Sequence, residues 1–139
     1  MSFLHVKKEN NHVFQLKFSN TSVVVKKNCI YGSSPNLKSG NFEMLTSLRL
    51  SLGLSKDHFS EISCHNDIGF LCCNSGDAQV QKISIFPFHE IENLLIKPEH
   101  IVAFSSDLRL KVESFHIQFI KKGNIGTFLS TKKMFDGGY

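Results

Sequence analysis

Two segments of the chain follow one pattern: residues 23–38 read VVVKKNCIYGSSPNLK, and residues 94–109 read LLIKPEHIVAFSSDLR. They align without a gap at a constant offset of 71 residues, which is about half of the 139-residue chain. Self-similarity at a fixed spacing indicates an internal repeat. Four of the sixteen positions are identical, namely Lys26 with Lys97, Ile30 with Ile101, Ser34 with Ser105 and Leu37 with Leu108.

Both segments predict the same local structure: an apolar strand, a polar tight turn, a second apolar strand, and a Ser-rich turn with Asn or Asp before Leu. Two such halves facing each other would bury their apolar faces in one core, as in a two-sheet sandwich or a double-stranded β-helix. The repeat therefore predicts a mainly β single domain over residues 1–139, with half-repeats at about 12–66 and 67–139. One hydrophobic core is also the expectation for a chain of this length.

Alternation of apolar and polar residues predicts further strands. Residues 13–18 are expected to form the first strand, because Phe14, Leu16 and Phe18 alternate with polar residues. The same period of two recurs over residues 108–112 and again in Phe115, Ile117 and Phe119.

Two more segments read as strands of a different kind. The apolar run Ile68 to Cys73 suits a strand that is buried on both faces. Val80, Ile83 and Ile85 open a strand that Pro87 ends or confines to a sheet edge.

The segment before residue 54 fits two patterns. Phe42, Leu45 and Leu48 are three apart, as on a helix, but four leucines then alternate with other residues over 48–54. Because the alternation is the longer pattern, we expect a strand near 48–54 with at most one helical turn before it. Residues 56–61 are expected to be a polar connection, and residues 74–77 and 123–126 to be turns.

The charge of the chain is modest and spread out. Sixteen Lys and Arg residues against twelve Asp and Glu give a formal net charge of +4. Such a charge favours solubility, with weak attraction to phosphate or anionic lipid as a secondary effect. The lysines form four separate pairs, Lys7-Lys8, Lys26-Lys27, Lys121-Lys122 and Lys132-Lys133, so no single basic stripe is predicted.

No apolar run approaches the roughly 18 residues of a membrane span. We therefore expect a soluble or peripheral protein. Residues 1–10 lack both an apolar stretch and an Arg-rich amphipathic pattern, so they predict no secretory or organellar presequence.

The four cysteines are the first candidates for chemistry. Cys64-His65, Cys72 and Cys73 could converge on a zinc ion across a hairpin, but the paired Cys-x-x-Cys motifs of structural zinc sites are absent. The His-x-His motif of cupin metal sites is absent as well. We interpret the four cysteines, including Cys29, as reduced and buried thiols, and expect no metal or cofactor site.

A nucleophilic pair is also conceivable. Cys29 or Cys64 could be activated by His100 or His116, because a thiolate needs a nearby base or cation to form at neutral pH. His116 lies on the polar side of its strand, and His89-Glu90 follows Pro87 in a turn, so these read as solvated residues. Ser33-Ser34 and Ser105-Ser106 are turn residues without a surrounding Gly-x-Ser-x-Gly motif, and no phosphate-binding glycine motif occurs. We therefore predict no catalytic residues and no enzymatic activity.

The segment from Leu94 to Glu113, with IKPEHIVAFSSDL at residues 96–108, resembles the second-half signature of the family named in yeast "altered inheritance of mitochondria 24". Val23 to Leu37 resembles the early hairpin of that family, and Asn66 to Leu71 stands where the family has a Gly-containing strand. The resemblance implies a double-stranded β-helix like that of the tryptophan RNA-binding attenuation protein. It also implies a role at the mitochondrial inner membrane, in cristae organisation and respiratory complexes.

These features lead to one main hypothesis and three alternatives. The main one is a non-enzymatic scaffold or assembly domain that acts through protein partners or as a homo-oligomer, intracellular, mitochondrial by resemblance and otherwise cytoplasmic. The first alternative is an RNA-binding β module, in which exposed Phe residues stack bases beside lysines. Peripheral binding to an anionic membrane and a cupin-like metal enzyme are the other two.

Overall fold

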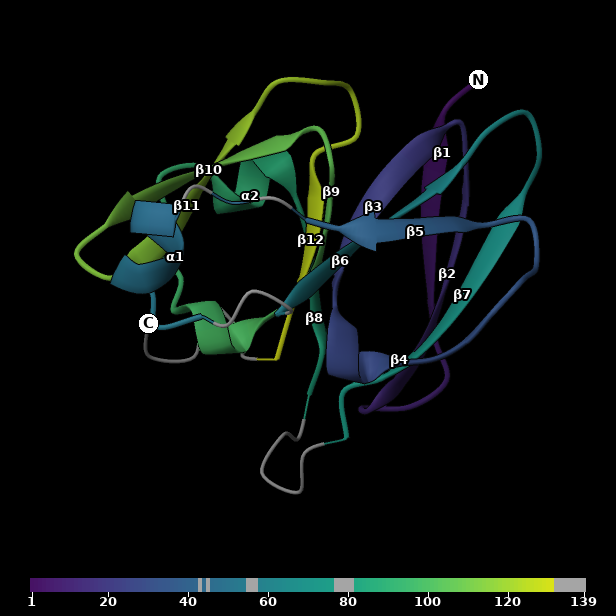
Figure 1. Cartoon of the computed structure of the whole chain (residues 1–139), viewed down its shortest axis with the longest axis horizontal. Coiled ribbons are helices and arrows are strands. Elements are labelled where there is room, and N and C mark those ends of the chain that lie inside the picture. The colour runs from purple at the N-terminus through teal and green to yellow at the C-terminus, as the bar shows by residue number, and fades with distance from the viewer. Residues whose placement is uncertain (43, 45, 55–57, 77–81, 132–139) are drawn as a thin grey trace.

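The computed structural model describes residues 1–42, 44, 46–54, 58–76 and 82–131 (Figure 1). Strands dominate this part of the chain, and its helices are short. The strands are β1 (Phe3–Lys8), β2 (Val13–Ser19), β3 (Thr21–Lys26), β4 (Ile30–Ser33), β5 (Lys38–Asn41), β6 (Phe59–Cys64), β7 (Gly69–Asn74), β8 (Ser84–Pro87), β9 (Ile101–Ser105), β10 (Leu108–Glu113), β11 (His116–Lys121) and β12 (Thr127–Ser130). The helices are α1 (Thr46–Ser51), α2 (Phe88–Ile91) and the 3-10 turns η1 (Lys27–Cys29) and η2 (Pro98–His100).

The strands form three antiparallel sheets. A four-stranded sheet in the order β1-β2-β7-β4 packs against a six-stranded sheet in the order β5-β6-β3-β9-β12-β8. The β10–β11 hairpin forms the third sheet, on the other side of the six-stranded sheet (Figure 1). The predicted mainly β class and sandwich architecture are confirmed. Among the described helices, none has the length and apolar composition needed to cross a membrane.

The two repeated segments follow the same backbone path. In the first copy β3 leads through η1 into β4, and in the second an extended residue, Ile96, leads through η2 into β9. The turns begin at Lys27 and Pro98, which are separated by the offset of the sequence repeat. The residues before the turns are also alike, with φ −57° and ψ 118° at Lys26 and φ −66° and ψ 135° at Lys97.

The strand pairing repeats as well. β4 pairs with β7 and β5 with β6, just as β9 pairs with β12 and β10 with β11. β2 adds to β7 as β8 adds to β12. On this pairing the first set of strands extends to Asn74, past the boundary expected near residue 66.

The copies meet edge to edge rather than face to face. β3 of the first copy pairs with β9 of the second, with Val24 opposite Phe104, and this joins one sheet of each copy into the six-stranded sheet. That central sheet is therefore covered on both faces. The valines of β3 divide accordingly: Val23 and Val25 point into one core, and Val24 points into the other.

The expectation of a single core shared by two facing halves is therefore wrong. The first core lies between the four-stranded and six-stranded sheets and includes Phe14, Leu16 and Leu71. The second lies between the six-stranded sheet and the β10–β11 hairpin with both helices, and includes Phe104, Phe119 and Phe128. The two sandwiches share the six-stranded sheet, and each core takes side chains from both copies: Val102 and Leu129 lie in the first core, and Val24 and Phe59 lie in the second.

The predicted strand at 48–54 is wrong, because residues 46–51 form helix α1. Gly53 has φ +70°, and the N–H groups of Gly53 and Leu54 bond back to Leu50 and Arg49. This is the hydrogen-bond pattern with which a left-handed glycine ends a helix. Leu50 is 64% exposed, whereas Leu52 and Leu54 pack against the second core.

Three smaller expectations also need correction. The connection expected at 56–61 gives way to β6 from Phe59 onward. Phe115 does not continue the buried face of Ile117 and Phe119, because it lies in the hairpin turn with φ +61° and is 75% exposed. The run Ile68 to Cys73 is not buried on both faces, because the outer face of its strand, β7, is open. Pro87 lies on the edge strand β8 as expected, while Val80 is outside the described residues.

Candidate functional site

The vicinal cysteines belong to opposite faces of one strand. Successive side chains of a strand alternate, so Cys73 is buried in the first core while Cys72 is half-buried on the outer face of the four-stranded sheet. On that face the Gln15 amide nitrogen lies 4.0 Å from the Cys72 sulfur. The zinc hypothesis required both thiols on one side. In the described part of the chain, no three His, Cys, Asp or Glu side chains are placed to share a metal ion.

The buried thiols are poorly suited to nucleophilic chemistry. Burial raises the pKa of Cys29, although the nearby Lys26 opposes the shift. Burial also raises the pKa of Cys64, aided by Asp67, and that of Cys73, aided by its neighbours Cys29 and Cys72. All three remain protonated at neutral pH, and the protonated thiol is a weak nucleophile.

The remaining sequence candidates occupy structural or exposed positions. Ser34 and Ser105 form hydrogen bonds within turns, to Asn36 and Asp107 respectively. The His116 ring nitrogen Nδ1 lies 2.6 Å from the backbone oxygen of Ser114. In two His–Glu neighbours the His Nε2 lies 3.9 Å from the Glu Oε1, and the carboxylate is exposed to solvent. They are His89 with Glu90 and His100 with Glu99.

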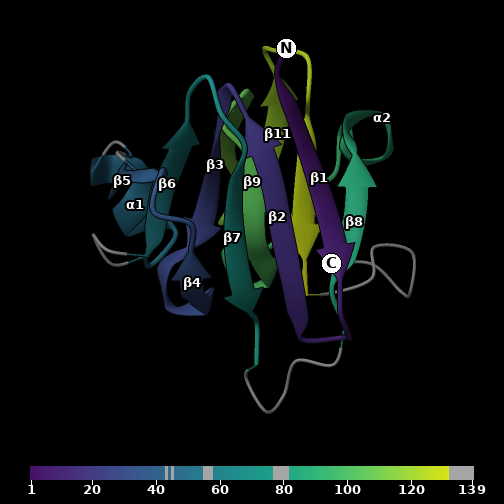
Figure 2. The same ribbon diagram turned by 90° about the vertical axis from the view of Figure 1, so that its right-hand side faces the viewer.

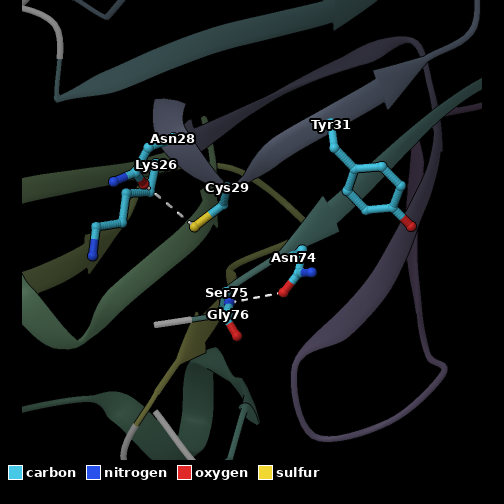
Figure 3. A pocket seen from close by; sticks show the side chains of 7 residues that line it. All are labelled: Lys26, Asn28, Cys29, Tyr31, Asn74, Ser75 and Gly76. Atoms are coloured by element: carbon cyan, nitrogen blue, oxygen red, sulfur yellow. Dashed lines mark hydrogen bonds between the residues drawn. The ribbon is translucent and has the colours of Figure 1, made fainter. Parts of the chain in front are cut away.

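A polar cavity of about 430 Å³ lies beside η1, between the start of β4 and the end of β7 (Figure 3). The Cys29 sulfur is 3.7 Å from the Asn28 side-chain oxygen, and the Asn74 side-chain oxygen accepts the N–H of Gly76. Both contacts join chain neighbours, whereas the Ser75 hydroxyl donates to the backbone oxygen of His12, so these polar groups do not converge on one point. The lining is completed by Lys26, Tyr31 and Ser75.

The outer face of the four-stranded sheet is the most distinctive surface. Figure 2 looks onto this face, where β7, β2 and β1 lie side by side, and none of the described elements covers it. Strand register places His5, Lys17 and Phe70 in one row across the sheet. The Lys17 ammonium stands 6.0 Å from the centre of the Phe70 ring, within the range of a cation–π contact.

A second row runs parallel to the first. Lys7 lies opposite Gln15, and Gln15 lies opposite Cys72. The Phe3 ring stacks at a tilt on His5, with ring centres 5.1 Å apart, and extends the aromatic surface along β1. We call these residues the outer face: Phe3, His5, Lys7, Gln15, Lys17, Phe70 and Cys72.

Charge distinguishes the four strands that build this face. β1, β2, β4 and β7 contain no Asp or Glu. Two of their three lysines, Lys7 and Lys17, lie on the outer face, whereas Lys8 donates to the backbone oxygen of Ile83. Lys7 has an acid near it in the following turn, Glu9, at 3.6 Å, and both side chains are solvated. A solvated ion pair of this kind contributes little to stability. The outer face is thus cationic and partly aromatic.

Sequence reasoning placed two of the seven outer-face residues and missed the other five. The alternation in residues 13–18 placed Gln15 and Lys17 on a polar side. Phe70 and Cys72 were missed because an apolar run gives no sign of which neighbour leaves one side open. The residues of β1 were missed because residues 13–18 were expected to form the first strand, although Leu4 and Val6 alternate with His5 and Lys7 and indicate an earlier one.

Comparison with known proteins gives a fold and nothing further. No protein-family model matches the chain, and no curated protein matches it. Among solved structures, the chain is similar to the crystal structure of a Streptococcus pyogenes protein from a structural genomics consortium, with a TM-score of 0.59 at 11% identity. The match covers 94% of this chain and 64% of the other, so the chain spans less than two thirds of that protein.

Proposed function

We propose that this chain is a non-enzymatic assembly domain that binds an acidic segment of a partner protein on the outer face. The observation that carries the proposal is the open four-stranded sheet with lysines and aromatic rings but no carboxylate in its strands. Aromatic side chains are enriched at protein interfaces because they bury a large area at a small entropic cost.

The acidic character of the partner follows from the cost of burying lysine. Covering Lys17 with an apolar surface would strip its ammonium of water without compensation. A partner carboxylate placed beside Lys17 would offset that cost and would raise the association rate. Phe70, opposite Lys17 in register, supplies the apolar contact in the same place.

The resemblance to the mitochondrial family supports an assembly role at the mitochondrial inner membrane, which forms part of the same proposal. Cell fractionation of the tagged protein tests this location. Recovery in the cytosolic fraction alone would contradict it.

A titration monitored by NMR tests the binding proposal. The ¹⁵N-labelled protein is titrated with a Glu-rich peptide containing two aromatic residues, at about 50 and about 200 mM salt. We expect saturable shifts confined to β1, β2 and β7, and weaker binding at the higher salt because exposed charges are screened. Lys17→Glu should abolish the shifts. Lys111→Glu, on β10 across the molecule, is the matched control and should leave them unchanged.

Single-stranded RNA is a second candidate for the same face, favoured by the position of Lys17 beside the Phe70 ring. Bases stack on aromatic rings of sheet surfaces, each worth about 1–3 kcal/mol. The same titration with oligouridine separates the two. Phe70→Leu keeps apolar volume but removes the stacking platform, so it should weaken RNA binding far more than peptide binding.

The remaining outcomes also decide the matter. Tight binding of oligouridine without peptide binding would replace the first proposal with the second. Binding only to vesicles of phosphatidylcholine with phosphatidylserine would contradict both and favour a membrane surface. Dimerisation in light scattering that Lys17→Glu abolishes would replace the acidic partner with a second copy.

A further inference from the structure

The first sandwich has an open end between its two sheets. β4 is the edge of the four-stranded sheet and β5 is the edge of the six-stranded sheet, so neither has a second neighbour among the described strands. A cavity of about 330 Å³ lies between them. This volume falls within the range of small-molecule sites in proteins. We call it the β4–β5 cleft.

The floor of the cleft is apolar and reaches the first core. Ile62 and Leu71 line it, and both belong to that core with exposed fractions of 4% and 0%. Ile30 on β4 and Leu37, in the loop directly before β5, add partly buried apolar surface. Because Ile62 and Leu71 are almost fully covered, a ligand entering the cleft would meet mainly the hydrocarbon of Ile30 and Leu37.

The rim of the cleft is polar and carries one sign of charge. Ser39 and Ser60 provide hydroxyl groups, and among the described lining residues Lys27 is the one cation and there is no Asp or Glu. Ser39 lies opposite Ile62 in the register of β5 and β6, so the hydroxyl borders the apolar floor. Lys27 is exposed at the start of η1, directly after β3.

The second copy does not offer the same opening. The strand that corresponds to β4 is β9, which pairs with β3 as well as β12 and is buried along its whole length. β4, in contrast, alternates between half-buried and exposed residues. The cleft is therefore a feature of the first sandwich and not a general property of the repeat.

We propose that the β4–β5 cleft binds a small amphiphile with one anionic head group, the head beside Lys27 and the short hydrocarbon chain against Ile30 and Leu37, next to Ile62 and Leu71. The apolar floor selects the chain, and the ammonium of Lys27 at the rim selects the sign of the head. This site is independent of the outer face and holds whether or not a partner binds there.

Methyl NMR of the full chain tests the proposal with three probes of one chain length: octanoate, octyl phosphate and octanol. Octanoate should shift the methyl signals of Ile62 and Leu71 saturably, below the concentration at which it forms micelles. Comparing octanoate with octyl phosphate distinguishes a carboxylate head from a phosphate head. Octanol should bind more weakly because it has no charge to meet Lys27.

Two variants probe the rim and the entrance. Lys27→Met should weaken the binding of octanoate by up to about fivefold, as expected for an exposed ion pair, and leave the binding of octanol unchanged. Ser39→Phe should fill the entrance and block all three probes. Lys38→Met is the matched control, because Lys38 precedes Ser39 on β5 and points to the other face.

Several results would overturn the proposal. One is that octanoate causes no saturable shifts at Ile62 and Leu71. Another is that the same shifts persist in a folded Ser39→Phe variant. Equal affinity for octanoate and octanol, unchanged by Lys27→Met, would overturn the anionic head. Lys27→Met changes an exposed side chain and keeps the test valid if Ser39→Phe does not fold. Lys17→Glu should leave octanoate binding unchanged, so failure here is distinguishable from failure of the outer face.

Discussion

The hydroxyl of Ser105 donates a hydrogen bond of 2.6 Å to the carboxylate of Asp107, in the turn between β9 and β10. The first copy repeats the contact between Ser34 and Asn36 at 2.7 Å. Each serine oxygen also accepts an N–H at the start of a distant strand, from Thr127 in one copy and from Phe70 in the other. The two turns therefore fasten β12 to β9 and β7 to β4.

The Asp107 carboxylate predicts a specific acid sensitivity. Burial opposes its ionisation, but hydrogen bonds from Ser105 and from the N–H groups of Ile125 and Gly126 outweigh burial and lower its pKa. A lowered folded-state pKa stabilises the fold above the unfolded value, near 3.9, and the stabilisation is lost as the pH falls through the folded value. Asp107→Asn should cost about 1 kcal/mol at pH 7.

Urea unfolding of Asp107→Asn and of the parent chain, at pH 7 and at pH 3, checks this prediction. The difference between the two chains should shrink at the lower pH. Glu113→Gln, an exposed carboxylate on β10, serves as the control and should track the parent chain at both pH values. A constant difference for Asp107→Asn would contradict the assignment.

Gly126 is predicted to tolerate no side chain. Its φ is +59°, and an added Cβ would stand 2.8 Å from the Cβ of Phe88. The left-handed backbone and the close contact together should make Gly126→Ala cost about 2 kcal/mol or more. Gly40→Ala is the control, because nothing lies within 4 Å of its added Cβ and its φ is ordinary. Thermal unfolding should show a lowered Tm for Gly126→Ala and no loss for Gly40→Ala.

Phe115 is predicted to be a site where truncation stabilises the fold. Ser114 and Phe115 both have positive φ, 51° and 61°, as in a tight hairpin turn that favours Asn-Gly. Phe115→Gly should relieve strain and raise the free energy of unfolding by about 0.5–1 kcal/mol. Phe119→Ala, on the same hairpin, should instead cost about 3–5 kcal/mol, because Phe119 packs with Phe104 and Phe128. Denaturant unfolding measures both.

Cys72 should be the first thiol to react with an alkylating reagent in the folded protein. Its side chain lies on the outer face, whereas the other three cysteines are buried. Mass spectrometry of peptides after timed exposure to iodoacetamide identifies the site. Cys72→Ser should remove the fast phase. Faster labelling of Cys29, Cys64 or Cys73 in the folded state would contradict the arrangement of β7, and a bound partner on the outer face should slow the labelling of Cys72.

The sequence was a good guide where a pattern fixes one face of a strand. Phe14, Leu16 and Phe18 alternate strictly, and all three are buried in the first core. The repeat predicted the matching turns at Lys27 and Pro98 because tight turns depend on local residues. These features need no knowledge of what lies across the sheet.

The errors share a physical cause, which is that tertiary partners decide between patterns of equal local quality. Leu48 to Leu54 alternates like a strand, but Gly53 takes a left-handed conformation that ends a helix instead. The outer face could be assigned only in part, because the exposure of Phe70 depends on what packs over β7, and none of the described elements does. The prediction of a single core was wrong because the pairing between β3 and β9 cannot be deduced from the sequence of either strand alone.

The shared central sheet has a consequence for how the molecule opens. Val24 and Phe104 face each other in register and line the second core, while Val23 and Ala103 line the first. Separating β3 from β9 would expose side chains of both cores to solvent at once, so neither sandwich can unfold independently of the other. The amides of β3 and β9 should then exchange with deuterium last, on the timescale of global opening.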